Sequence, residues 1–147
     1  MANQTDRTRR SISTLLHVLK IMERDVPTAH DRFKSHPSDI GALHFIGDNP
    51  GCQARALADH LGVAATTVSS LLDRLERAGL IARERPPENR RAIALSLSVI
   101  GLEVRDAIIS EERDNAKRIL AALPRGRREE FVSSLETIAA RLSQDEA

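Results

Sequence analysis

Hydrophobic residues recur at intervals of three and four along the first third of this 147-residue chain, the spacing of an amphipathic helix. One apolar stripe predicts a helix that ends near Pro27; its members are Ile12, Leu15, Leu16, Leu19, Met22 and Val26. We expect helix to resume over residues 29–34. Another helix is predicted from Pro37 onward, and the Asn-Pro-Gly tripeptide at 49–51 then predicts a turn.

The pattern changes from helix to strand within residues 53–97. A short helical pattern over 53–61 meets Gly62, and a longer one over 64–78 stops at Gly79. Two runs with strand-like alternation follow at 80–85 and 92–97, joined by the loop PPENRR at 86–91. The predicted core of this region consists of Leu57, Leu61, Val68, Leu71, Leu72 and Leu75. Two helices followed by a hairpin predict a winged helix-turn-helix, an arrangement that reads duplex DNA.

Two further amphipathic helices are predicted after the hairpin. Ser98 is positioned to cap the first, Pro124 interrupts the pattern, and the last helix carries Phe131, Leu135, Ile138 and Leu142. The apolar stripes are too long for a small winged module to cover, so we expect a homodimer that buries them. The predicted fold class is mainly α with a small β-hairpin wing. Residues 1–147 form one domain, in which dimerisation helices at about 8–35 and 98–145 flank a DNA-binding module at about 38–97.

Composition narrows the class of protein. The net charge of +1 says nothing about nucleic acid, although residues 65–91 hold six arginines against four acids. Aromatic residues make up 2% of the chain, which disfavours base stacking as the mode of nucleic-acid binding. One cysteine excludes an internal disulfide, and no apolar run reaches the ~20 residues of a membrane span. We expect a cytoplasmic protein without a membrane partner.

The outer face of the 64–78 helix has the residue types that major-groove readout requires. Small and hydroxyl-bearing side chains near its N-terminal end let the backbone approach base edges; these are Ala65, Thr66, Thr67, Ser69 and Ser70. Arg74 and Arg77 lie farther along and are predicted to contact phosphates, Arg74 above all. In the hairpin, Arg85, Arg90 and Arg91 are predicted to contact phosphates or the minor groove.

The segment LADHLGVAATTVSSLLDRLERAGLIARERPPENRRAIALSLSVIG resembles the MarR family of transcriptional regulators. The resemblance extends over most of the chain, because the flanking helices fall where the dimerisation helices of that family fall. It implies a homodimer that binds pseudo-palindromic double-stranded DNA, usually as a repressor. Release by a small ligand or an oxidant is common in the family.

Four positions depart from the family pattern, and one of them, Ser98 in place of the usual Thr, preserves the helix cap. Asn89 stands where the family wing has Asp, so a charge-assisted bond that would brace the wing arginine is lost. Ala64 replaces the usual Ser at the start of the recognition helix, which removes a side-chain cap worth ~1 kcal/mol. Ser70 stands where Arg or Lys is common, so base readout is expected to differ.

Effector and metal sites are less strongly indicated. The resemblance implies a cleft for a small aromatic or carboxylate effector; its candidate residues are Ile12, Leu16, His17, Phe33, Leu43, His44 and Ile108. The same residues suit an ordinary core. His30 and His36 lie near Asp31 and Asp39, but no tight metal-ligand spacing occurs, so neither a metal nor a cofactor is predicted. Cys52 is interpreted as a small structural residue.

Two alternatives to a DNA-binding regulator remain. A helical interaction module that kept the winged fold and lost DNA readout is compatible with Asn89 and with the small surplus of arginine. An enzyme is the least favoured, because the sequence has no phosphate-cradling glycine loop, nucleophile elbow or paired acid/base motif.

Overall fold

A computed structural model describes residues 3–24 and 37–145 in two compact units, Met1–Lys34 and Ser35–Ala147. The first unit contains helix α1 (Gln4–Arg24), which begins where the side chain of Asn3 accepts a hydrogen bond from the Asp6 N–H at 2.8 Å. The predicted apolar stripe of α1 is exposed at Ile12, Leu15 and Leu16. The helix expected over residues 29–34 lies outside the described residues, as does the predicted end near Pro27.

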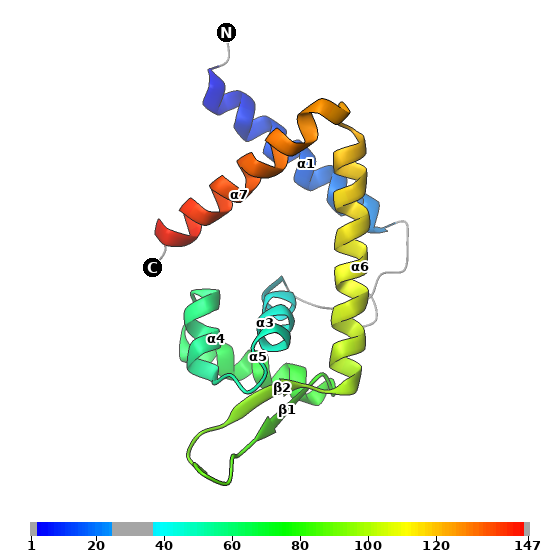
Figure 1. Ribbon diagram of the computed structural model, residues 1–147. Coiled ribbons are helices and arrows are strands. Elements are labelled where there is room, and N and C mark those ends of the chain that lie inside the picture. Colours follow the sequence, from blue (N-terminus) through cyan, green and yellow to red (C-terminus); the bar gives the residue numbers. More distant parts are fainter. Residues whose placement is uncertain (1–2, 25–36, 146–147) are drawn as a thin grey trace. The chain divides into compact units, whose positions relative to one another are not determined.

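The second unit begins with the predicted winged module (Figure 1). Its elements are α3 (Pro37–Asp48), α4 (Ala54–Leu61), α5 (Ala65–Arg77) and the antiparallel strands β1 (Ile81–Glu84) and β2 (Ala94–Leu97). Gly62, at φ 64°, makes the turn between α4 and α5, and Gly79, at φ 75°, follows the end of α5. Both positions require the left-handed backbone that glycine adopts without strain.

The core of the module lies around α3, which contacts α4, α5, α6 and β2. Five of the six predicted core residues of the helix-turn-helix are buried, whereas Leu61 is half-buried. The core also includes Leu43 and Ile46 of α3, Leu95 of β2 and Ile108 of α6. Each fully buried side chain of this kind contributes about 1.5–3 kcal/mol relative to an exposed one.

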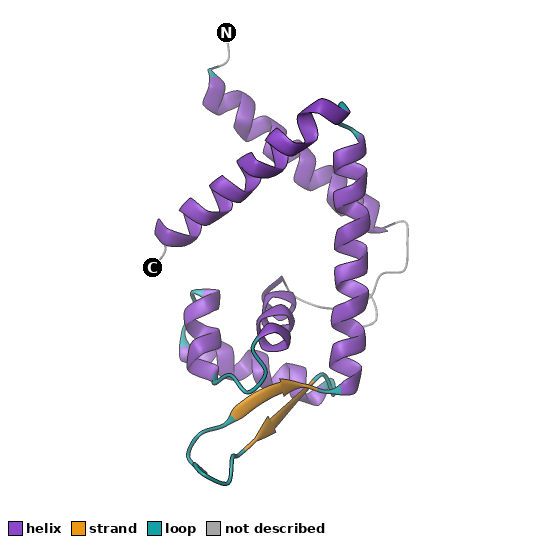
Figure 2. Cartoon of the chain, viewed as in Figure 1, coloured by secondary structure: helices purple, strands orange, loops and turns teal. Residues whose placement is uncertain are grey.

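The hairpin differs from its prediction at its ends (Figure 2). Leu80 lies outside β1 because its N–H donates to the Leu75 carbonyl at the end of α5. The Leu80 carbonyl accepts a hydrogen bond from the Ser98 N–H. A short third strand segment pairs with β2: the Gly51 N–H donates to Leu95 at 2.7 Å, and the Leu95 N–H donates to Cys52 at 2.8 Å. The sequence pattern predicted only a turn at residues 49–51, since two residues are too few to show strand alternation.

Helix α6 (Val99–Ala121) follows the wing directly, and the predicted cap is confirmed: the Ser98 hydroxyl accepts from the Gly101 N–H at 3.0 Å. After Pro124 come a 3₁₀ turn, η1 (Arg125–Arg127), and helix α7 (Arg128–Asp145). Three apolar residues of α7 stay uncovered, with exposed fractions of 49% at Leu135, 54% at Ile138 and 61% at Leu142, whereas Phe131 is half-buried. Across the described residues, each helix is too short or too polar for a bilayer span.

Candidate nucleic-acid interface

Helix α5 presents one polar face and one buried face, as predicted. Val68, Leu71, Leu72 and Leu75 are buried, while Ala65, Thr66, Thr67, Ser69 and Ser70 are all exposed. The Ser70 hydroxyl donates to the Thr66 carbonyl at 3.2 Å, which leaves its oxygen lone pairs available as acceptors. The outer face is therefore small enough for the backbone to come close to a partner and carries hydroxyl groups that can bind it.

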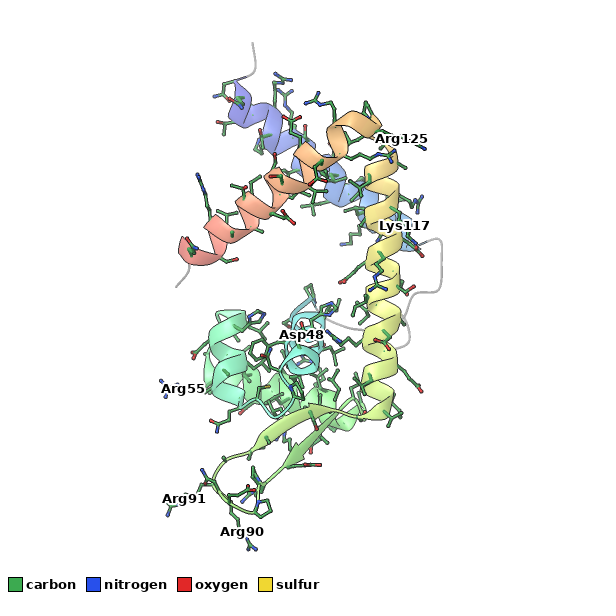
Figure 3. The ribbon with its side chains drawn as sticks, viewed as in Figure 1. Asp48, Arg55, Arg90, Arg91, Lys117 and Arg125 are labelled. Carbon is green, nitrogen blue, oxygen red and sulfur yellow. The ribbon has the colours of Figure 1, made fainter. Side chains whose placement is uncertain are left out.

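The start of α5 borders a groove. Ala64 is the N-cap and makes no side-chain cap, which agrees with the cap loss expected from the sequence. A groove of about 450 Å³ runs between α4 and α5, lined by residues that include Arg55, Asp59, Ala65 and Ser69. Arg55 is exposed and projects outward from α4 (Figure 3). Arg55 was not among the residues predicted to bind DNA, although the first helix of a helix-turn-helix crosses the DNA backbone.

Arg74 and Arg77, both predicted to contact phosphates, have different surroundings. The Arg74 guanidinium donates two hydrogen bonds to the carboxylate of buried Asp39, a fork with Nη2–Oδ1 at 2.6 Å and Nε–Oδ2 at 3.4 Å. The hydrogen bond that Arg74 donates to Asp39 raises the pKa of Arg74 above its ordinary value. Arg77 is exposed, and its Nε donates to the Asp73 carbonyl of its own helix at 3.2 Å. Arg77 is thus the freer of the two cations.

An ionic brace joins the wing to α5. Arg83 of β1 donates to Asp73 at 2.7 Å and lies 3.4 Å from a carboxylate oxygen of Glu76. Its side chain is 26% exposed, so solvent only partly screens the two pairs. Because both acids belong to α5, the brace fixes the wing relative to the predicted recognition helix.

The wing tip carries the predicted arginines. Arg85, Arg90 and Arg91 are exposed, and Arg90 and Arg91 extend from the end of the loop (Figure 3). Asn89 accepts a hydrogen bond from the Arg91 backbone N–H at 3.2 Å, an Asx turn that its amide makes without a charge. Asn89 therefore shapes the main chain of the tip, and the Arg91 guanidinium extends beyond it.

The residues of the expected effector cleft fall in three places. Ile12, Leu16 and His17 are exposed on α1, and Phe33 lies outside the described residues. Leu43 and Ile108 are 0% and 1% exposed in the core of the second unit. This burial agrees with the alternative interpretation that these residues are ordinary core. His44 Nε2 lies 3.1 Å from Glu112 Oε1, so it joins α3 to α6.

A second pair joins the same two helices. Arg105 of α6 binds Asp48 at the end of α3 and packs over Gly47, where an added Cβ would lie 2.6 Å from Arg105 Cδ. Helix α3 thus has ionic contacts with α5 near its start and with α6 near its end.

The environment of Cys52 and the grouping of the described histidines bear on redox and metal chemistry. Burial raises the pKa of the Cys52 thiol, which lowers its thiolate fraction at neutral pH. Among the described residues, no group of three His, Cys, Asp or Glu side chains could hold a metal ion. His30, Asp31 and His36 lie outside that part of the chain.

Known proteins resemble this chain in sequence and fold. Residues 36–92 match the model of the MarR family. A candidate regulatory protein for the hcr operon of Thauera aromatica is 29% identical over 87 residues, 56% of this chain and 52% of the relative. The aligned region thus spans about half of that protein. The transcriptional repressor Rv2887 of Mycobacterium tuberculosis is 27% identical over 65% of this chain and 69% of its own.

Solved structures share the whole fold. The FabT protein of Streptococcus pneumoniae, solved in complex with DNA, superposes with a TM-score of 0.81 at 22% identity, over 97% of this chain and 99% of that one. Rv2887 in complex with salicylic acid superposes with a TM-score of 0.64 at 22% identity, over 94% and 97% of the two chains.

Proposed function

We propose that this chain, whose residues 36–92 match the model of the MarR family, is a sequence-specific, DNA-binding transcriptional regulator. The observation that carries the proposal is the exposed, hydroxyl-rich face of α5 braced to an arginine-tipped wing. In this proposal Ala65, Thr66, Thr67, Ser69 and Ser70 read base edges in the major groove. Phosphate or minor-groove contacts come from Arg55, Arg77, Arg85, Arg90 and Arg91.

The regulator acts as a homodimer in this proposal, with residues 1–147 as one domain. The support is the pair of apolar stripes that the described residues leave exposed, one on α1 and one on α7. A second copy would remove these stripes from water at roughly 25 cal/mol per Å². Two-fold symmetry would then place two α5 helices on successive major grooves of an inverted repeat.

Repression of transcription in the cytoplasm is the proposed role, and catalysis is no part of it. The names of the relatives support this: Rv2887 is called a transcriptional repressor, and FabT was solved with DNA. A protein-interaction module without DNA readout is less well supported, because three wing arginines remain exposed where a duplex would meet them.

Selection of bound duplexes from a random pool tests the DNA-binding proposal. We expect the purified 147-residue chain to enrich an inverted repeat whose half-site centres lie about 10–10.5 base pairs apart. Ser69→Ala should change the preferred base within each half-site, whereas Thr137→Ala on exposed α7 should leave it unchanged. If the wild-type protein enriches no sequence, the proposed function is wrong.

A small aromatic acid is the proposed effector class, by analogy with the salicylic acid complex of Rv2887. Salicylate at 100 times its Kd should stabilise the protein by about 2.7 kcal/mol in thermal unfolding. It should also weaken binding to the selected duplex. Benzyl alcohol keeps the ring without the carboxylate and serves as the control. Unchanged melting and DNA affinity in salicylate would count against an aromatic-acid effector.

A further inference from the structure

A buried carboxylate on α3 contacts the predicted recognition helix. Asp39 is 1% exposed in the first turn of α3, and its two oxygens face Nη2 and Nε of Arg74 at 2.6 Å and 3.4 Å. The Arg74 side chain is 42% exposed, so its guanidinium spans from the core to the surface. The fork joins residues 35 positions apart in the chain and ties α5 to α3 directly.

The chemistry of the pair restricts Arg74. Separating a buried ion pair weakens the compensation of the buried carboxylate's charge, so the pair resists opening. A fork of two parallel hydrogen bonds also needs the planar guanidinium, which the point charge of lysine does not reproduce. Arg74 is therefore held to Asp39, with only part of its donor set available to a partner outside.

The position of the fork on α5 links it to base readout. Arg74 lies four residues after Ser70 and eight after Thr66, spacings that place all three along one side of the helix. The buried apolar residues of α5 hold the helix against the core through hydrophobic contacts, which do not fix its orientation as a hydrogen bond does. The fork adds a directional contact one turn from Ser70.

We propose that Asp39 and Arg74 are positioning residues that set the placement of α5 in the major groove. Arg74 acts on sequence preference through Asp39 and does not neutralise a phosphate. This inference rests on the proposed DNA-binding function and gives Arg74 another role than the phosphate contact expected from the sequence. Arg77, exposed three residues later, takes the phosphate role.

Salt dependence separates the two roles. Each lost phosphate contact lowers the slope of log K against log salt by about 0.9, or about 1.8 for a dimer. We expect Arg77→Ala to show that loss with an unchanged preferred sequence. Arg74→Lys keeps the positive charge, so its slope should stay unchanged under either role, and its effect is measured as sequence discrimination. The wild type should bind the selected duplex roughly tenfold more tightly than a duplex with a single mismatch. In Arg74→Lys this ratio should be several fold smaller.

Asp39→Asn gives a second, independent readout. It frees the Arg74 guanidinium, which would strengthen phosphate binding if Arg74 were a phosphate contact. We expect weaker discrimination and no gain in affinity. The double variant D39N/R74Q, which pairs two neutral amides, replaces D39N if thermal unfolding shows that D39N does not fold; it should lose discrimination at an unchanged salt slope.

The outcomes distinguish this inference from the function on which it rests. A wild-type protein that selects no duplex refutes the proposed function itself. A wild type that selects an inverted repeat, together with an R74K variant that discriminates like the wild type, would overturn the positioning role alone. So would tighter DNA binding by D39N, or a slope reduced by about 1.8 in D39N/R74Q.

Discussion

Replacing Gly101 with alanine is expected to destabilise the protein by about 3 kcal/mol. A Cβ at this position would lie 1.9 Å from the carbonyl oxygen and 2.9 Å from the carbonyl carbon of Leu80. The obstructing atoms are backbone, so no rotamer change relieves the overlap. The Leu80 carbonyl also accepts the Ser98 N–H at 2.9 Å, and the Ser98 hydroxyl donates to Gly79 at 2.5 Å. Helix α6 must therefore move away from the base of the wing and weaken these bonds.

Urea unfolding of G101A and of the wild type measures this effect, with Gly126→Ala as the matched control. An added Cβ at Gly126 meets nothing within 4 Å, so that variant should differ from the wild type by less than about 1 kcal/mol. If G101A unfolded at the wild-type urea concentration, the close approach of α6 to Leu80 would be wrong. If G101A unfolds at a lower urea concentration, the close packing of the start of α6 against the base of the wing is confirmed.

Local patterns in the sequence predicted most of the fold. Helices α4 and α5 and the cap at Ser98 were predictable because apolar spacing, a turn glycine and a capping hydroxyl lie within a few residues of one another. The exposed side of α5 followed from the same periodicity. Strand ends were less predictable, since the hydrogen bonds of Leu80 to Leu75 and Ser98 decide where β1 begins.

Long-range charge pairing explains what the sequence did not predict. The sequence predicts a phosphate contact at Arg74 and does not indicate its partner Asp39, which lies 35 residues away on another helix. The contact between Arg105 and Asp48 and that between His44 and Glu112 span 57 and 68 residues. No spacing rule identifies such pairs before the fold is known. Arg55 was missed for a different reason, since an exposed arginine on a short helix is ordinary until the adjoining groove is seen.

Removing both wing-tip arginines with R90A/R91A is expected to weaken binding to the selected duplex by roughly 10- to 100-fold, or about 1.4–2.8 kcal/mol. Both side chains are exposed at the end of a loop whose main chain Asn89 shapes, so their loss should not disturb the core. In a homodimer the variant removes four cations from the interface. Arginine gains most in a narrow minor groove, where the negative potential is enhanced.

Fluorescence anisotropy over a series of salt concentrations measures this loss as affinity and as salt slope. The slope should fall by up to about 3.6 if all four arginines displace counterions. The control R113A/R125A removes the same charge from α6 and η1, where both arginines are exposed and Arg125 lies at the end of α6 away from the wing (Figure 3). We expect the control to keep the wild-type affinity at 150 mM salt, where screening acts over about 8 Å. Equal losses in the two variants would mean that general charge attracts the duplex, and the wing would then have no specific contact with DNA.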